Sequence, residues 1–422
     1  MFPRKPEHCA MLDHLFQQKF ETLLAAANIT INGNRPWDIR VHDRRMFRKT
    51  MLQGNLGFGE SYMEGWWDCD DLEELFYRIL SAGVDQQLVT LASALEYLQG
   101  ALINLQKPAR AFTVGKHHYD AGNDLFRAML DPLMMYSCAY WHEADSLDEA
   151  QQNKLCLVFE KLDLKPGMKL LDIGCGWGGA ARFAAEHYGV QVVGITVSKE
   201  QASFARELCK DFDVDILLMD YRQLEGEFDR IVSIGMIEHV GYKNYRTYFD
   251  TARRCLKPDG RMLVQSIGSN ESVTGTDPWI EKYIFPNSML PSPSQISRGF
   301  EGRFVLEDWH SFGYDYALTL KAWESNITRK WPQIEKHYDK KFYRMWRYYL
   351  LSCAGAFRAR TIQLWQILLT PSGIKGECCI PHQPVKRKFR DRGNDPAKLH
   401  RMPAPALGQR REFPRSDVAA ES

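Results

Sequence analysis

Residues 170–179 read LLDIGCGWGG, and this stretch decides the fold. A short apolar run ends in the acid Asp172, and four glycines then fall within the six residues 174–179. An apolar run that passes directly into glycines is typical of a buried strand ending in a tight turn. The residues from the last glycines onward, GGAARFAAEHY, have a helical pattern. The stretch therefore predicts a strand, a glycine loop and a helix in succession.

The same order of strand and helix repeats along the chain. Further strands are predicted for the apolar runs VQVVGITV (190–197), VDILLMD (214–220), FDRIVSIGM (228–236) and RMLVQSIG (261–268). After an insertion, FVLEDW (304–309) and IQLWQILL (362–369) are the last predicted strands. Strands that alternate with helices predict an α/β fold with a parallel, doubly wound sheet.

The glycines match the dinucleotide pattern GxGxxG, which is a weak signal by itself. Dinucleotide sites place an acid about 20 residues further on, and here that strand ends near Thr196 without one. The carboxylate of Asp172 would repel a diphosphate, whereas it would attract a ligand that carries an ammonium and a sulfonium. S-adenosylmethionine carries both groups. We therefore expect Asp172 and the four glycines to hold its methionyl part. These glycines are Gly174, Gly176, Gly178 and Gly179.

Three parts are expected along the chain: an N-terminal domain (1–105), a catalytic domain (106–370) and a disordered basic tail (371–422). The N-terminal part holds turn-like pieces, INGNRPWD (31–38) and GNLGFGESYMEGWW (54–67), before a long helical pattern. Apolar residues there alternate steps of four and three, which predicts a helix that packs on its own domain, joins a dimer or faces lipid. They are Val84, Leu88, Leu91, Leu95, Leu98, Leu102 and Leu105.

Composition excludes several classes of protein. The formal net charge of the 422 residues is +1, so no overall field attracts nucleic acid. The ten cysteines show no CxxC pair and predict reduced thiols rather than a disulfide framework or a zinc site. No apolar run approaches the ~18 residues of a spanning helix, and the N-terminus has no signal-peptide pattern. We expect a cytoplasmic protein that touches a membrane only through a local patch. The basic cluster at 386–392 in the tail is one candidate for that patch.

A series of ordered motifs also resembles a known family. GKHHYDAGNDLF (115–126), YSCAYW (136–141), LLDIGCGWGG (170–179) and GITVSKEQ (194–201) are followed by GMIEHVG (235–241), DPWIEKYIFPN (277–287) and CAGAFRAR (353–360). Together they resemble the cyclopropane-fatty-acyl-phospholipid synthases and the related mycolic acid cyclopropane synthases. The resemblance runs from about residue 31 to about residue 366. It implies a class I S-adenosylmethionine-dependent methyltransferase fold behind a mostly helical N-terminal domain.

The resemblance implies methylene transfer from S-adenosylmethionine to a cis double bond of a phospholipid acyl chain. The alkene attacks the sulfonium methyl, a carbocation forms, a proton leaves and the ring closes. Such a site needs an apolar channel, aromatic faces near the cation, a weak base and the exclusion of water. The implied partner is an unsaturated phospholipid at the inner face of a membrane. A homodimer is also expected.

The resemblance also assigns residues. Tyr119 and Tyr136 surround the reacting carbon, and Tyr136 and Ser137 contact the cofactor. The segment from Thr196 to Gln201 holds the ribose, with Gln201 in place of the missing acid. The residues that follow the third strand of the catalytic domain hold the adenine. They are Asp220, Tyr221 and Arg222.

In the family a bicarbonate ion is the base that removes the proton. The resemblance implies that Glu238 and Tyr316 hold this ion, with backbone groups of Cys138 and Ile267. The family usually has a histidine where this chain has Gln265, which can donate a hydrogen bond but carries no charge. Strand alternation places Gln265 on the same face as Ile267. We predict a synthase that works but needs more bicarbonate.

Cys353 matches a cysteine to which the family assigns a catalytic role. The alkene is already the nucleophile, so the mechanism needs no thiolate, and a structural thiol is the alternative interpretation. Two other functions stay open at this stage. One is a methyltransferase that leaves a methyl branch on the acyl chain, and the other is a lipid-binding protein without activity.

Overall fold

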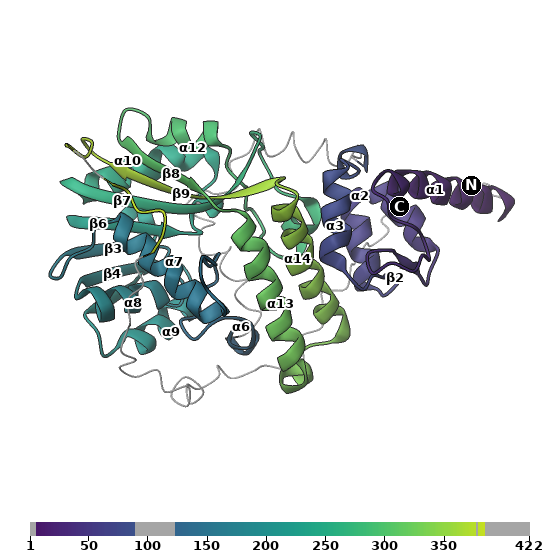
Figure 1. The fold of residues 1–422 in the computed structure, drawn as a ribbon, viewed down its shortest axis with the longest axis horizontal. Helices are drawn as coiled ribbons and strands as arrows, with labels where there is room; N and C mark the ends of the chain where they lie inside the picture. Colours follow the sequence, from purple (N-terminus) through teal and green to yellow (C-terminus); the bar gives the residue numbers. More distant parts are fainter. Residues whose placement is uncertain (1–5, 89–122, 377–378, 385–422) are drawn as a thin grey trace, which may run out of the picture.

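The computed structural model describes residues 6–88, 123–376 and 379–384 (Figure 1). Its main feature is one sheet of seven strands in the order β5-β4-β3-β6-β7-β9-β8. The strands are β3 (Lys169–Ile173), β4 (Gln191–Thr196), β5 (Val214–Leu218), β6 (Phe228–Ile234), β7 (Leu256–Ser269), β8 (Val305–Ser311) and β9 (Ile362–Thr370).

The expected parallel sheet is correct for six strands and wrong for β9, which pairs antiparallel with both β7 and β8. The helices before β9 explain the reversal. Helix α13 (Tyr314–Ile334) leads away from the sheet, and α14 (Lys340–Arg358) returns beside it (Figure 1). The chain therefore re-enters the sheet at the edge that it left after β8, and its last strand must run in the opposite direction.

Helices cover both faces of the sheet, as the doubly wound prediction requires. Alternate residues of each strand point to opposite faces: Leu170 packs with α7 (Leu147–Lys161) and α8 (Gly179–Tyr188), whereas Leu171 packs with α10 (Tyr245–Cys255) and α12 (Pro293–Phe300). Strands β6, β7 and β9 divide their residues in the same way. Both faces are therefore apolar, which is the pattern of a buried parallel sheet. Helix α9 (Lys199–Cys209) lies between β4 and β5 in the sequence.

The N-terminal unit, residues 6–88, is mostly helical, as expected. It consists of α1 (Pro6–Ala26), β1 (Arg40–Val41), α2 (Arg45–Met63), β2 (Trp67–Asp68), α3 (Leu72–Ser81) and a 3-10 turn, η1 (Asp85–Leu88). The turn expected at 54–67 is mainly helix α2, which breaks only at Gly54. The other glycines allow close packing instead: a Cβ atom on Gly59 would lie 2.4 Å from the ring of Trp279.

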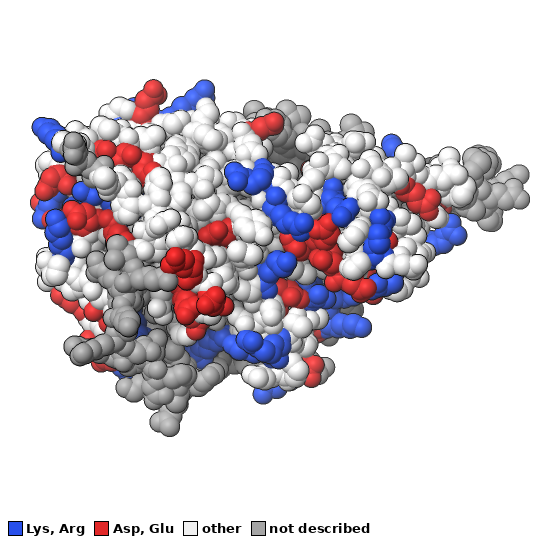
Figure 2. Space-filling view, viewed as in Figure 1, with Lys and Arg blue, Asp and Glu red and all other residues white. Residues whose placement is uncertain are grey.

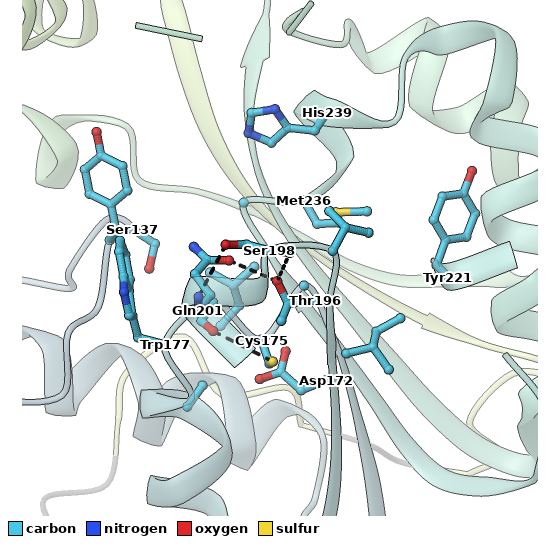
Figure 3. A pocket seen from close by; sticks show the side chains of 18 of the residues that line it. Ser137, Asp172, Cys175, Trp177, Thr196, Ser198, Gln201, Tyr221, Met236 and His239 are labelled. Atoms are coloured by element: carbon cyan, nitrogen blue, oxygen red, sulfur yellow. Dashed lines mark hydrogen bonds between the residues drawn. The ribbon is translucent and has the colours of Figure 1, made fainter. Parts of the chain in front are cut away.

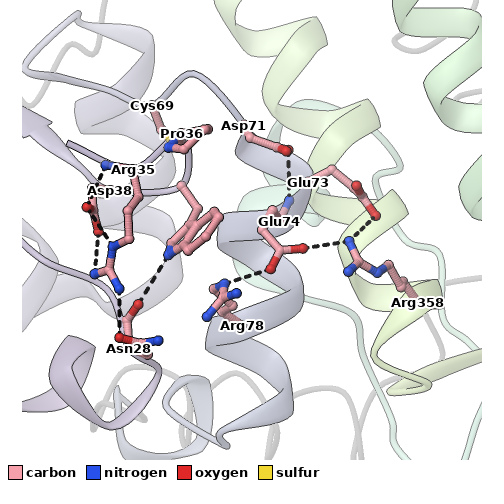
Figure 4. Close-up of polar contacts among 11 residues, drawn as sticks. Asn28, Arg35, Pro36, Asp38, Cys69, Asp71, Glu73, Glu74, Arg78 and Arg358 are labelled. Atoms are coloured by element: carbon pink, nitrogen blue, oxygen red, sulfur yellow. Dashed lines mark hydrogen bonds and ion pairs between the residues drawn. The ribbon is translucent and has the colours of Figure 1, made fainter. Parts of the chain in front are cut away.

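The N-terminal unit shares one hydrophobic core with α13, α14 and α6 (Asn123–Met129). Ion pairs reinforce the junction: Arg358 on α14 lies 3.1 Å from Glu73 and 2.7 Å from Glu74, both on α3 (Figure 4). Lys321 on α13 lies 3.1 Å from Glu73. On the face in Figure 2, basic and acidic side chains are intermingled around these helices. The unit is thus packed directly on the catalytic part. The expected boundary at 105 and 106 lies outside the described residues.

Two predicted features fall partly outside the described residues. Of the helical pattern at 84–105, Val84 is buried in the shared core and Leu88 ends η1, while the other positions are not described. Of the tail, residues 371–376 and 379–384 are described. The stretch around His382 is ordered, in contrast to the predicted disorder. Its carbonyl accepts a hydrogen bond from Tyr140 (2.7 Å), and its ring lies 2.8 Å from Asp308. The basic cluster at 386–392 lies outside the described residues.

Candidate active site

Two cavities meet at the carboxyl edge of the sheet. The first, of about 190 Å³, is called the glycine-loop pocket here; its walls are the segments around 134–137, 172–180, 195–201 and 219–222 (Figure 3). The second, called the large cavity, has a volume of about 870 Å³ and extends from Glu238 to the N-terminal unit. Five residues line both cavities, so the two adjoin. They are Tyr136, Ser137, Gly235, His239 and Phe285.

Asp172 lies at the inner wall of the glycine-loop pocket, one residue before the end of β3. Its side chain is buried, with 2% exposure, and Oδ2 has no hydrogen-bond partner among the described residues. Burial raises the pKa of Asp172 to about 7, although the nearby ammonium of Lys154 opposes the rise. An unpartnered buried carboxylate is costly, so this position suits a ligand that brings a positively charged donor.

The four predicted glycines have different roles. Gly174 and Gly176 have positive φ angles, +87° and +54°, and both line the pocket. A Cβ atom on Gly176 would meet no protein atom within 4 Å, so the space beside it is available to a ligand. Gly179 lines the pocket and also allows close approach, because its Cβ would lie 2.0 Å from the carbonyl oxygen of Leu133. Gly178 does not line the pocket; its predicted cofactor contact is replaced by packing on α9.

The residues after β4 form the next wall. The Thr196 hydroxyl donates to the Gln201 side-chain carboxamide oxygen (3.0 Å), and the Ser198 hydroxyl accepts from the backbone amide of Gln201 (3.3 Å). All three residues line the pocket (Figure 3). Thr196 thus fixes the Gln201 side chain at the wall where the sequence places the ribose, without an acid at this position.

The predicted adenine segment lies at the far end of the same pocket. Asp220, Tyr221 and Arg222 all line it. Arg222 Nη2 lies 2.6 Å from Asp220 Oδ2. Burial alone would raise the pKa of Asp220, but hydrogen bonds from the side chain and the backbone amide of Arg222 hold this pKa below its usual value. The Tyr221 hydroxyl is buried without a hydrogen-bond partner among the described residues, and burial raises its pKa to about 12. The segment therefore offers an ionised carboxylate, a neutral phenol and a guanidinium.

A buried lysine that the sequence did not reveal supports the loop 131–138. Lys154 on α7 has an exposure of 0%, and its Nζ donates to the Ser137 hydroxyl (3.1 Å). Asp131 accepts hydrogen bonds from the amides of Leu133 and Met135, both at 2.9 Å. Burial lowers the pKa of Lys154. These contacts fix the backbone that carries Tyr136 and Ser137 into both cavities.

Glu238 follows β6 and lines the large cavity. Its Oε1 accepts from the backbone amide of Ile267 (2.7 Å), while Oε2 is buried without a hydrogen-bond partner among the described residues. Burial raises the pKa of Glu238 to about 7. The Ile267 amide is thus occupied by Glu238. Cys138 is fully buried at the cavity wall, and its thiol donates to the carbonyl of Ala139 (3.1 Å).

Gln265 and Tyr316 line the same cavity as this carboxylate. Gln366 on β9 lies opposite Gln265 and donates to its amide oxygen (3.0 Å). The amide nitrogen of Gln265 makes no hydrogen bond to the described residues and remains a donor. The Tyr316 hydroxyl also makes none, and its ring stacks on Phe357 at 4.6 Å. The described residues therefore leave one carboxylate oxygen and two donors for a further group.

Aromatic rings surround the junction of the cavities. The hydroxyls of Tyr136 and Tyr349 lie 3.0 Å apart, and the ring of Tyr136 lies 5.2 Å from that of Trp323. Tyr349 was not predicted from the sequence. The predicted partner ring, Tyr119, lies outside the described residues. These faces provide the electron-rich wall that a cationic intermediate requires.

Two further side chains at the cavity walls are neutral. Burial raises the pKa of the Cys353 thiol to about 12, so it is protonated at neutral pH, which favours its structural interpretation over a nucleophilic one. His239 lines both cavities, and burial lowers its pKa to about 4. His239 was not predicted as a cavity residue from the sequence, although it is the neighbour of Glu238. Among the described residues there is no group of ligands for a metal ion.

Comparison with known proteins identifies the family. The family model of mycolic acid cyclopropane synthetase matches residues 106–367. The cyclopropane-fatty-acyl-phospholipid synthase of Escherichia coli K12 is 55% identical over 349 residues, which cover 82% of this chain and 91% of that protein.

Two solved structures resemble the catalytic part. The cyclopropane synthase MmaA2 from Mycobacterium tuberculosis is 33% identical with a TM-score of 0.58, and 99% of it aligns with 63% of this chain. The mycolic acid cyclopropane synthase CmaA1, complexed with SAH and CTAB, is 35% identical with a TM-score of 0.57; 97% of it aligns with 61% of this chain. The fold is that of class I S-adenosylmethionine-dependent methyltransferases, and the chain belongs to the mycolic acid cyclopropane synthetase family.

Proposed function

We propose that this chain is a cyclopropane-fatty-acyl-phospholipid synthase, which transfers a methylene group from S-adenosylmethionine to a cis double bond of a phospholipid acyl chain. One observation carries the proposal: a pocket with an unpartnered, buried carboxylate oxygen of Asp172 adjoins, through Tyr136 and Phe285, a large cavity rich in apolar side chains. A methyl donor and an alkene held in these two spaces would meet at an aromatic wall. The Escherichia coli relative, which is 55% identical over 82% of this chain, bears this name.

S-adenosylmethionine suits the glycine-loop pocket in three ways. The unpartnered carboxylate oxygen of Asp172 can accept from its ammonium, and the open side of Gly176 leaves room for its methionyl part. Gln201, Asp220 and Tyr221 provide polar groups further along for the ribose and the adenine. When bound, it supplies a sulfonium methyl that the alkene can attack.

The described residues around the reacting carbon serve two needs. The faces of Tyr136, Tyr316 and Tyr349 can stabilise positive charge on the acyl chain. The buried apolar wall keeps out water, which would otherwise capture the cation as an alcohol. The proton that leaves the cation requires a base, and Glu238, with a pKa raised to about 7 by burial, lies at the same wall.

We infer that a bicarbonate ion binds between Glu238, Gln265 and Tyr316. The free Oε2 of Glu238 can accept from the bicarbonate hydroxyl, while Gln265 and Tyr316 can donate to its other oxygens. The thiol and backbone of Cys138 lie in the same wall. Because the Ile267 amide donates to Glu238, Ile267 would act on the ion through this carboxylate. A neutral amide donor gives a weaker bond than a charged histidine, which supports a higher bicarbonate requirement.

The double bond lies within a bilayer, so the protein must reach the membrane from one side. No helix among the described residues is long and apolar enough to cross a bilayer. We propose peripheral attachment at the inner face, with the basic cluster at 386–392 as the contact; each basic side chain near an anionic surface contributes about 1 kcal/mol. A homodimer remains a proposal.

The test of the function is one incubation with labelled S-adenosylmethionine and vesicles of unsaturated phospholipid. Mass spectrometry of the acyl chains should show a gain of one CH₂ and no remaining alkene at the labelled position. A labelled methyl branch would instead show the alternative methyltransferase. Absence of label under conditions in which the chain binds S-adenosylmethionine would show a lipid-binding protein without activity.

The test of the bicarbonate site uses two variants. Gln265→His should lower the bicarbonate concentration that gives half-maximal rate, roughly tenfold if the histidine is charged. Glu238→Gln should remove most activity at every concentration. If Gln265→His changes nothing while Glu238→Gln inactivates, glutamine is an equivalent donor. If neither variant differs from the native chain, the site assigned to Glu238 is wrong.

A further inference from the structure

The far end of the large cavity is built by the N-terminal unit. Helix α1 contributes Phe20 and Leu24, α2 contributes Phe58, and α3 contributes Phe76 and Ile79. All five side chains are at least nine-tenths buried. The part of the wall that these five side chains form is therefore apolar, and it lies outside the residues 106–367 that the family model matches.

A hydroxyl contact, one step along α14 and two ring contacts connect the aromatic junction to this wall. Near Glu238, Tyr136 meets Tyr349 on α14 through their hydroxyls (3.0 Å). The preceding residue of α14, Tyr348, packs edge-on against Phe76 with ring centroids 5.1 Å apart. Phe76 in turn lies 6.1 Å from Phe58. The cavity lining thus runs from the aromatic junction along α14 to α3 and α2.

The two ends of the cavity differ in polarity. Polar side chains gather along the segment 269–288, where Asn55 donates to Asp277 (3.0 Å) and Lys282 pairs with Glu60 (2.7 Å). Lys282 is half exposed, so this side approaches solvent. A phospholipid has a charged head and an apolar chain end. The polar side suits the head, and the wall of Phe20, Phe76 and Ile79 suits the terminal methyl.

We propose that the N-terminal unit limits how far an acyl chain can extend beyond its double bond, with Ile79 and Leu24 as specificity-determining residues. This inference rests on the proposed function. With the double bond held at the aromatic junction, the carbons on its methyl side run along α14 and end at the wall. A hydrophobic pocket distinguishes two substrates that differ by one CH₂ by a factor of about ten in kcat/KM. Each methylene group that the wall admits or rejects should therefore change the preference between acyl chains about tenfold.

The experiment measures competition between phospholipids in mixed vesicles. Their cis-monounsaturated chains differ by two methylene groups on the methyl side and are identical on the carboxyl side. Mass spectrometry gives the ratio of cyclopropane products, which is the ratio of kcat/KM. A second pair of lipids differs only on the carboxyl side and serves as the internal reference.

Four variants test the wall. Ile79→Ala deepens the cavity and should shift the product ratio toward the longer chain about tenfold if the space admits one of the two extra methylene groups and about a hundredfold if it admits both. Ile79→Phe and Leu24→Phe shorten it and should shift the ratio toward the shorter chain. The matched control is Leu75→Ala: Leu75 is a buried apolar residue of the same helix but does not line the cavity. It should lower thermal stability like Ile79→Ala and leave the ratio unchanged.

The results separate the inference from the function. Product from the native chain with unchanged ratios in both Ile79 variants would overturn the inference and leave the function intact. Equal shifts in Leu75→Ala and Ile79→Ala would show general loosening and would also overturn it. Absence of product from the native chain with every lipid would refute the proposed function. If Ile79→Ala does not fold, Ile79→Phe and Leu24→Phe still test the inference, because both should shift the product ratio toward the shorter chain.

Discussion

Protonation of Asp172 should control the affinity for S-adenosylmethionine. The carboxylate is buried, its Oδ2 has no hydrogen-bond partner among the described residues, and burial raises its pKa to about 7. Only the ionised form can pair with the ammonium of the ligand. Affinity should therefore be complete above the pKa and fall as the pH drops below it, because the bound complex stabilises the ionised state.

The magnitude follows from the ionised fraction. With a pKa of about 7, lowering the pH from 8 to 6 reduces that fraction about tenfold, and the affinity for the charged form of the ligand falls by the same factor. At pH 7, binding should release about half a proton. Asp172→Asn replaces a charged hydrogen bond by a neutral one and should weaken binding by about 0.5–2 kcal/mol, which is a factor of about 2 to 30. The variant should also lose the acid limb of the pH profile.

Isothermal titration calorimetry measures both effects. Titrations across the pH range give the affinity, and buffers with different ionisation enthalpies give the protons released. The α-amino group of the ligand itself loses its charge near pH 8, so affinity also falls on the alkaline side. This alkaline limb should persist in Asp172→Asn and identifies the ligand's own titration. A native affinity that stays constant between pH 6 and 7, or equal affinity in the variant, would refute the reasoning.

Three further outcomes are expected. Lys154→Met removes the ammonium that opposes the rise in the pKa of Asp172, so the acid limb should move to higher pH in the same calorimetric series; an unchanged limb would show that Lys154 acts only on the loop. Gly176→Val should abolish binding of S-adenosylmethionine, since the valine side chain would occupy the open space of the pocket and Gly176 has a φ of +54°. Undiminished affinity would show that the ligand does not bind at this loop. Truncation after Pro384 keeps the described residues of the tail and should reduce salt-sensitive sedimentation with anionic vesicles; intact binding would place the membrane contact in the folded part.

The strand–glycine–helix stretch and the alternating segments were sufficient to predict the doubly wound sheet. They did not predict the direction of β9, because an apolar strand such as IQLWQILL has the same pattern in either direction. The direction depends on how many helices separate two strands and where they lead the chain. Here α13 and α14 return it to the edge where β8 ended, a feature of tertiary structure that has no local signal.

Glycines show a similar limit at the site. The pattern around 174–179 correctly indicated a pocket, yet it could not distinguish Gly176, which faces open space, from Gly178, which lies against α9. Both have positive φ angles, so the backbone requirement is the same. Only the neighbours decide whether the missing side chain makes room for a ligand or for another helix. Likewise, the glycines at 54–67 predicted a turn, whereas in the structure only Gly54 interrupts helix α2.

The residues that sequence reasoning missed lie on elements without a functional pattern. Lys154 belongs to a polar-looking stretch of α7, where a lysine is expected at the surface, and it is buried only because the loop 131–138 folds over it. Tyr349 is one of two adjacent tyrosines on α14, and the helix sends one toward Tyr136 and the other toward Phe76. Both positions become meaningful only after distant segments meet.

The reversal of β9 also bears on the chemistry at Gln265. Antiparallel pairing with β7 places Gln366 directly opposite Gln265, and the two amides form a hydrogen bond inside the sheet. That bond fixes the oxygen of Gln265 toward β9 and leaves its nitrogen as a donor at the wall that holds Glu238. A glutamine without such a partner could turn either end toward the carboxylate, and the oxygen end would oppose an anion. In the proposed bicarbonate site, the pairing with Gln366 would therefore keep the amide nitrogen of Gln265, rather than its oxygen, toward the anion.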